Sequence, residues 1–225
     1  MGYRGGSGMR AAWGVGTVNA GALHLALGRT PDPYIRPADQ GTARHRELYW
    51  RLYLKTDPGW IGGGGYKLSR AQILATSKWA QAMIAPVWSG AGSTARRFLQ
   101  IDPFSGTDPA GNLRTTKYGD DANLRALGLA QSNTAIFDPD RLGRWACIEA
   151  RVRLNDPGQA NGVFELWIDN QLEASRGGLN WVGGYSQYGL NTVFLENYWN
   201  NGSPAAQARV LDQLIVSVAR IGCLP

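Results

Sequence analysis

The chain has 225 residues, 44% of them hydrophobic and 18% charged, which is ordinary for a globular protein. The net charge of +6 favours a polyanionic partner, but no basic run and no helix-turn-helix or RNA-recognition signature is present, so we expect no nucleic-acid partner. No stretch approaches the ~20 apolar residues of a membrane span, so we expect no membrane partner. Thirty glycines and eleven prolines between short apolar runs predict many strands and turns.

The first half of the chain contains one unambiguous strand. Residues 1–16 are predicted as a loop or a frayed strand, residues 17–28 as a strand, and residues 29–41, with three prolines, as a long loop. Residues 47–55 alternate strictly, and a glycine-rich loop ending at Gly65 follows them. One face of this strand is apolar and comprises Leu48, Trp50, Leu52 and Leu54.

Further strands follow without a competing helical period. They are expected at 66–68, 79–88, 97–102, 145–155, 162–169, 191–199 and 208–218. Residues 103–132 form a polar excursion, in which a short helix at 123–130 is the alternative to loop. Strands without intervening helices predict one all-β domain over 1–225, an antiparallel sandwich or barrel.

The outward face of 47–55 carries the first functional signal. It presents Tyr49, Arg51 and Tyr53 in succession, where a merely solvated strand would present small polar residues. Tyrosine rings stack on sugars, and a guanidinium binds a carboxylate through two parallel hydrogen bonds. We therefore expect a sugar-binding groove on this face, although cross-strand aromatic packing beneath a loop would produce the same pattern.

The two cysteines leave two readings open. Cys147 falls in a predicted strand and Cys223 just beyond the last one, which suits either a disulfide of a secreted protein or two buried thiols. The first ten residues lack the apolar core of a signal peptide, so we expect a trimmed chain or a fragment.

Several segments, in order, resemble the concanavalin-A-like jelly-roll polysaccharide lyases of the alginate and glucuronan type. They are "ELYWRLYLK", "GGGGYKL", "GRWACIEARVRLND", "NGVFELWIDNQLEA" and "VLDQLIVSVARIG", which together span Glu47 to Gly222. After Leu68 the lyases usually continue Pro-Gly, where this chain has Ser69 and Arg70. The Glu-x-Asp-x-Glu cluster of laminarinase-type hydrolases is missing, which argues against a retaining glycosidase.

The resemblance implies an extracellular enzyme that cleaves a uronate-containing glycan by β-elimination. Such a reaction needs a cation to neutralise the uronate carboxylate, a base and an acid. The expected catalytic residues are Lys67, Tyr53, Arg51 and Tyr198, and the expected substrate-binding residues are Tyr49, Glu47, His45, Asn197 and Trp167. His24 is assigned to strand decoration rather than to the site.

The alternative function is a non-catalytic carbohydrate-binding module of the same fold, and a structural or adhesion domain is a third. We expect no metal site and no required cofactor, with Ca²⁺ as an option for steadying loops. The oxygens available for it are those of Asp102, Asp108, Asp120 and Asp121. The expected partner is an acidic polysaccharide, bound by a monomer.

Overall fold

The computed structural model of the chain describes residues 1–32, 35–62, 66–90 and 92–225. The predicted loop 29–41 and the glycine-rich loop ending at Gly65 therefore lie partly outside the described residues. Within the described ranges there is no α-helix, and the short 3₁₀ helices are η1 (Tyr3–Gly5), η2 (Ala95–Arg97) and η3 (Asp121–Asn123). No helix in these ranges is long and apolar enough to cross a membrane.

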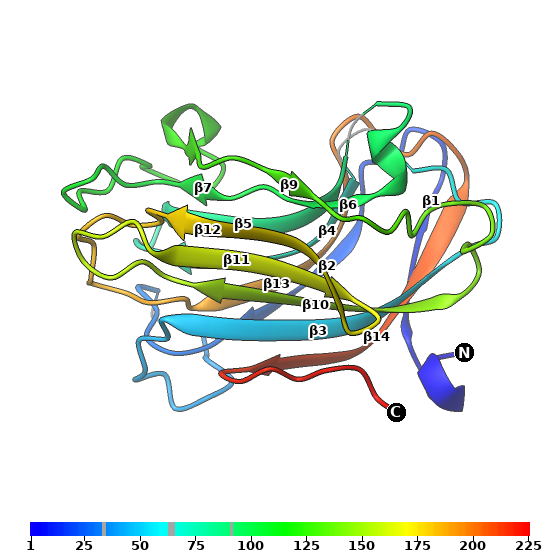
Figure 1. Cartoon of the computed structure of the whole chain (residues 1–225), viewed down its shortest axis with the longest axis horizontal. Helices are drawn as coiled ribbons and strands as arrows, with labels where there is room; N and C mark the ends of the chain where they lie inside the picture. The colour runs from blue at the N-terminus through cyan, green and yellow to red at the C-terminus, as the bar shows by residue number, and fades with distance from the viewer. Residues whose placement is uncertain (33–34, 63–65, 91) are drawn as a thin grey trace.

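The described strands form two antiparallel sheets, which we call sheet A and sheet B (Figure 1). From edge to edge, sheet A consists of β1 (Met9–Trp13), β14 (Gln207–Ser217), β3 (Glu47–Thr56), β10 (Trp145–Arg153), β11 (Gly162–Ile168) and β12 (Gln171–Leu179). The first strand of the chain thus pairs with the last.

Sheet B consists of β2 (Asn19–Ala26), β13 (Thr192–Trp199), β4 (Tyr66–Leu74), β5 (Gln81–Ser89), β6 (Leu99–Ile101) and β9 (Ala130–Gln131). The short β7 (Phe104–Ser105) pairs with β5 and with β8 (Arg125–Ala126). The polar excursion after β6 therefore forms short edge strands and η3, and the short helix considered at 123–130 is not formed.

The two sheets enclose one hydrophobic core, as the sequence pattern predicts. The apolar face of β3 is confirmed, because Leu48, Trp50, Leu52 and Leu54 are each at most 2% exposed. They pack with residues of sheet B in the same cluster, including Tyr66, Leu68 and Trp199. The all-β antiparallel sandwich predicted from the sequence is therefore the architecture of the molecule.

Candidate functional site

The outward face of β3, predicted to bind sugar, is closed in the structure. Tyr49, Arg51 and Tyr53 do point away from the core, as the alternation predicts. Arg51 is nevertheless only 1% exposed and Tyr53 only 3%. The prediction that these two side chains line an open groove and act on a substrate is therefore wrong, since a sugar ring has almost no surface of either to contact.

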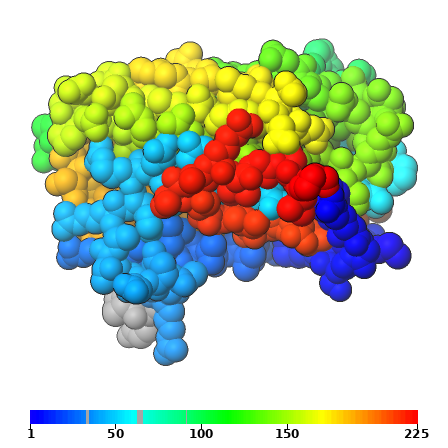
Figure 2. Space-filling model, turned by 60° about the horizontal axis from the view of Figure 1, so that its bottom comes forward, coloured from blue at the N-terminus to red at the C-terminus, as the bar shows by residue number. Residues whose placement is uncertain are grey.

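The C-terminal segment after β14 covers this face. Cys223 forms a disulfide with Cys147 of β10, which decides between the two states that the sequence left open. Leu224 donates its backbone N–H to the Tyr53 hydroxyl over 2.6 Å, and the Tyr3 ring stacks on Tyr53 with centroids 3.8 Å apart. Figure 2 shows the C-terminal residues, in red, lying on the surface, with N-terminal residues, in dark blue, beside one end of them.

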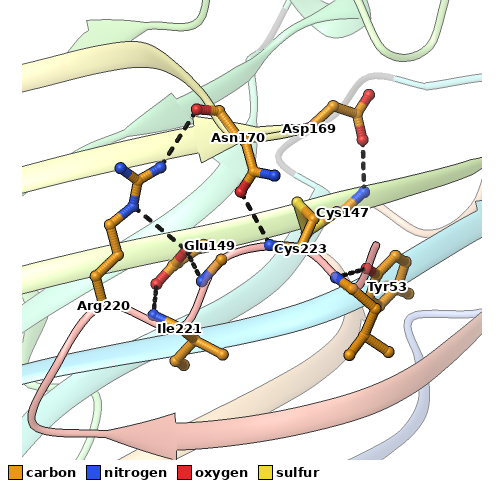
Figure 3. Close-up of a disulfide and its surroundings, with 10 residues drawn as sticks. Tyr53, Cys147, Glu149, Asp169, Asn170, Arg220, Ile221 and Cys223 are labelled. Carbon is orange, nitrogen blue, oxygen red and sulfur yellow. Dashed lines mark hydrogen bonds and ion pairs between the residues drawn. A yellow bond between two sulfur atoms is a disulfide. The ribbon is translucent and has the colours of Figure 1, made fainter.

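Glu149 of β10 accepts hydrogen bonds from the same segment (Figure 3). Its carboxylate is 1% exposed and accepts the backbone N–H groups of Ile221 at 2.7 Å and Gly222 at 2.9 Å. A buried carboxylate is costly unless it receives such hydrogen bonds. The covering segment is therefore an anchored part of the fold at this position.

The other predicted binding residues of sheet A belong to a network of ion pairs and rings. Arg151 donates to Glu47 over 2.6 Å, and the Tyr49 hydroxyl donates to Glu47 over 3.3 Å. Trp167 is 8% exposed and lies 4.8 Å below the Arg220 guanidinium. The structure places Glu47, Tyr49 and Trp167 on the sheet opposite to β4 and β13, so they share no site with Lys67 or Tyr198.

Asn197 and His45 also lie apart from the Lys67–Tyr198 pair, Asn197 in the interior and His45 at a separate cavity of about 420 Å³. Asn197 is 1% exposed, accepts from Arg209 Nε over 2.8 Å and donates to the Gly21 carbonyl over 3.1 Å. Its predicted contact with substrate is wrong because the side chain points into the interior. The His45 Nε2 atom lies 3.0 Å from an Asp39 carboxylate oxygen, in the loop before β3.

Lys67 and Tyr198 are two predicted site residues that the structure brings together on sheet B. They are register partners on β4 and β13, and the Lys67 ammonium lies 4.7 Å from the centre of the Tyr198 ring. On its other side it lies 5.1 Å from the centre of the Trp88 ring of β5. A cation between two aromatic faces is attracted by both rings, which fixes the position of the ammonium.

Register shifts in the strands produce this arrangement. The β4–β5 ladder shifts between Lys67 and Ser69, and the β13–β4 ladder shifts between Leu195 and Tyr198. Such a bulge turns the following side chains to the other face. Ser69 consequently points inward and accepts from Trp50 Nε1 over 3.0 Å, while Arg70 shares the outward face with Lys67.

Arg70 lies beside Lys67 but already has polar partners. One of its terminal nitrogens lies 2.9 Å from a Glu196 carboxylate oxygen, and it also donates to the Tyr118 hydroxyl. The Arg70 and Glu196 side chains are each 8% exposed. Lys67, by contrast, takes part in none of the ion pairs found among the described residues. The lysine is thus the cation of this face that remains available to a ligand.

Burial and neighbouring charges tune the lysine. Partial burial is the main cause that lowers the pKa of Lys67 below its usual value. Glu196 raises that pKa, Arg70 lowers it and Asp121 raises it, in decreasing order of effect. Because an ammonium in a partly dry environment interacts strongly with an incoming anion, this position suits the binding of a carboxylate.

An aromatic cavity continues the outward face of sheet B toward β2. The His24 ring stacks on Phe194 with centroids 3.4 Å apart. Trp79 lies in the turn between β4 and β5, with its ring 6.2 Å from that of His24. These rings line a cavity of about 220 Å³. Burial and the nearby Arg70 lower the pKa of His24, so the neutral imidazole is favoured there. His24 therefore belongs to the wall of the candidate site.

Two of the four aspartates considered for calcium, Asp108 and Asp120, have other partners. Asp120 accepts from Thr116 over 2.8 Å and from Asn123 over 3.0 Å, and Asp108 accepts from Asn112 over 2.8 Å. Within the described ranges no group of three or more His, Cys, Asp or Glu side chains is arranged to hold a metal ion. A role for calcium stays a prediction.

Sequence reasoning missed the residues around Lys67. Arg70, Glu196 and Trp88 share its face, but strict alternation from Lys67 would have selected Ser69 in place of Arg70. The change of phase is visible in 66–73, where the apolar positions pass from Tyr66 and Leu68 to Ala71 and Ile73. A second available signal was the aromatic and charged content of 194–198, "FLENY", on a predicted strand.

Solved structures similar to this one include several polysaccharide lyases and a cellulose-induced protein, Cip1. The PL-14 alginate lyase from Aplysia kurodai matches with a TM-score of 0.64 at 9% identity, covering 94% of this chain and 83% of that one. Endo-β-1,4-glucuronan lyase from Trichoderma reesei matches with a TM-score of 0.56 at 12% identity, covering 96% and 90%. A variant of alginate lyase Aly36B in complex with an alginate tetrasaccharide matches with a TM-score of 0.61 at 12% identity, covering 96% and 82%. No protein-family model and no curated protein matches the sequence.

The chain therefore has the jelly-roll fold of the alginate and glucuronan lyases, as its motifs predict. At this identity the likeness concerns the fold, and fold alone does not assign chemistry. The activity has to be argued from the side chains of sheet B.

Proposed function

We propose that this protein is a polysaccharide lyase that cleaves a uronate-containing polysaccharide by β-elimination on the outward face of sheet B. The observation that carries the proposal is the Lys67–Tyr198 pair, with an available ammonium 4.7 Å from a tyrosine ring. Both side chains are partly exposed on sheet B, in a fold shared with alginate and glucuronan lyases.

The proposed reaction assigns one role to each side chain. The Lys67 ammonium neutralises the uronate carboxylate, which makes the proton on the adjacent C5 carbon acidic. The Tyr198 hydroxyl oxygen accepts that proton while its own proton passes to the departing glycosidic oxygen. The C4–O bond breaks, a C4–C5 double bond forms, and the tyrosine ends in its starting state.

The surroundings of the pair support an acidic sugar chain as the substrate. The partly exposed Trp88 and the exposed His24 ring, which stacks on buried Phe194, offer aromatic surfaces on either side of the Lys67–Arg70 region. Aromatic faces pack on the C–H faces of sugar rings, and the net charge of +6 attracts a polyanion. One of the similar structures holds an alginate tetrasaccharide. The Cys147–Cys223 disulfide suits the extracellular location that we propose, where thiols are oxidised.

A panel of polyuronates tests the proposal. Incubation with alginate and glucuronan is expected to produce the ultraviolet absorbance of unsaturated uronates. Lys67→Gln should lower kcat/KM about 100-fold or more, because the developing negative charge loses its stabilising cation. The matched control is Lys55→Gln, since Lys55 also lies over a tryptophan, 5.9 Å from the Trp145 ring, but on sheet A. Its activity should stay that of the unchanged protein.

Two results would replace the proposal. Tight binding of a polyuronate without unsaturated product would identify a carbohydrate-binding module. Neither binding nor product across the panel would leave a structural or adhesion domain with the same fold.

A further inference from the structure

A fully buried arginine crosses the sandwich directly beneath the candidate site. Arg209 belongs to β14 of sheet A, where it pairs with Ala11 of β1 and Thr56 of β3, and it is 0% exposed. Its guanidinium reaches sheet B and lies 4.5 Å from the centre of the Tyr66 ring. The side chain therefore links the two sheets through the core.

The hydrogen bonds of this guanidinium end at the strands that carry Lys67 and Tyr198. One terminal nitrogen donates to the backbone carbonyl of Glu196 and, over 3.3 Å, to that of Lys67. The Nε atom donates to the side-chain oxygen of Asn197 over 2.8 Å. Glu196 and Asn197 immediately precede Tyr198, so Arg209 contacts β4 and β13 where their side chains enter the site.

These contacts coincide with the register shifts. The ladder between β13 and β4 is interrupted between Leu195 and Tyr198, and that between β13 and β2 between Glu196 and Tyr198. A bulge leaves backbone groups without ladder partners, and buried backbone groups need a substitute. Arg209 provides one, because its planar group reaches two strands at once.

Packing alone does not account for an arginine at this position. Among the described residues no carboxylate forms an ion pair with Arg209, and burial lowers its pKa. A buried charge without a counterion costs stability that an apolar side chain of similar volume would not. The arginine is thus a costly residue whose polar contacts all serve the bulged strands.

We infer that Arg209 is a positioning residue that holds the bulged segments of β4 and β13, and so keeps Lys67 and Tyr198 facing each other on the surface above it. The catalytic part of this inference rests on the proposed lyase function. The geometric part concerns the protein without substrate and is tested separately.

The test measures the pKa of Lys67 in the unliganded protein by NMR after ¹³C-methylation of the lysines, with Lys67→Gln identifying the signal. The charged and titratable groups facing Lys67 are Arg70 of β4, Glu196 and Tyr198 of β13, and Asp121 of η3. Arg209→Lys keeps the positive charge but has one donor nitrogen, so it cannot replace both the Nε bond to Asn197 and the terminal-nitrogen bonds to the two strand carbonyls in the same geometry. Lys67 should then become more exposed, and its pKa should rise toward the usual lysine value. The kcat on a polyuronate should fall about 100-fold with a much smaller change in KM, as expected for a misplaced reacting group.

Arg51→Met is the matched control, because Arg51 is also a buried arginine of sheet A but lies on the face away from sheet B. It should leave the Lys67 pKa unchanged. An equal shift in this control, or an unmoved Lys67 pKa in folded Arg209→Lys, would overturn the inference, whatever happens to kcat. A shifted pKa in a protein that cleaves no polyuronate would support the positioning role and reject the lyase proposal.

Should Arg209→Lys fail to fold, the variant Asn197→Ser tests the positioning role of Arg209. It removes the acceptor of the Nε hydrogen bond and leaves both carbonyl contacts in place. A smaller upward shift of the Lys67 pKa is expected, and no shift would overturn the inference.

Discussion

Lys67 and Arg70 are two neighbouring cations of sheet B, and they differ in the groups that they contact. One terminal nitrogen of Arg70 is bound to the Glu196 carboxylate and the Tyr118 hydroxyl, so Arg70 is already paired with a carboxylate of the protein. Lys67 is held by aromatic rings, which stabilise a cation without neutralising it. At the scale of residues this contrast explains why we assign the substrate carboxylate to the lysine.

The assignment predicts the pH dependence of the activity. Lys67 has to be protonated to neutralise a carboxylate, so activity is present below its pKa and is lost as the pH rises through it. Burial lowers that pKa, so the alkaline limb should lie below the usual lysine value of 10.5.

An exposed acidic neighbour provides the matching variant. The Asp121 carboxylate raises the pKa of Lys67, so Asp121→Asn should move the alkaline limb of kcat/KM to lower pH. A pH–rate profile of the two proteins measures the shift. A limb that stays in place or moves upward would contradict the role given to Lys67.

The C-terminal segment is the element that covers the outward face of β3, where the sequence predicts a sugar-binding groove. It lies over β3 and β10, is joined to β10 by the Cys147–Cys223 disulfide and is hydrogen-bonded to Glu149 and Tyr53. The disulfide closes a loop of 76 residues, for which a stabilisation of about 2–4 kcal/mol is typical. The segment therefore covers the outward face of β3 and β10 around Tyr53 and Glu149.

Removing the disulfide should separate stability from activity. The double variant Cys147→Ala with Cys223→Ala is expected to lose about 2–4 kcal/mol of unfolding free energy in urea titrations. Its kcat/KM on a polyuronate, measured where the protein is folded, should stay unchanged because the site lies on sheet B. A parallel loss of activity in the folded variant would show that the covered face contributes to the reaction.

The bulges of β4 and β13 are the second element-scale feature that strict alternation does not predict. Between Lys67 and Arg70 the pattern changes phase, which sends Ser69 to Trp50 and Arg70 to Glu196. Lys67 is predicted from the lyase resemblance and Tyr198 from the need of β-elimination for a base or acid, whereas Arg70, Glu196 and Trp88 depend on where the phase changes. That position is set by cross-strand and cross-sheet contacts such as those of Arg209.

At the scale of the whole molecule, each sheet carries one of the two tyrosines that the sequence analysis predicts to be catalytic. Tyr53 on sheet A bonds Leu224, and Tyr198 on sheet B faces Lys67. Tyr198→Phe should lower kcat about 100-fold or more, in the range of general acid–base catalysis, with little effect on the melting temperature. Tyr53→Phe should cost about 1 kcal/mol of stability through its lost hydrogen bond and leave kcat unchanged. Steady-state kinetics and thermal unfolding of both variants check the division, and the reverse result would place the site on sheet A.

The sequence by itself determined the β-architecture, the apolar face of β3 and the likeness to jelly-roll lyases. Alternation and turn residues are local, and local sterics orient each side chain relative to its own strand. The tertiary structure decided that Arg51 and Tyr53 are covered, whereas Lys67 and Tyr198 stay partly exposed. Tyr53 is covered by Leu224, which lies 171 positions away along the chain, and no pattern within 47–55 encodes that contact. It likewise decided that Lys67 meets Tyr198, because their pairing depends on register between strands distant in sequence.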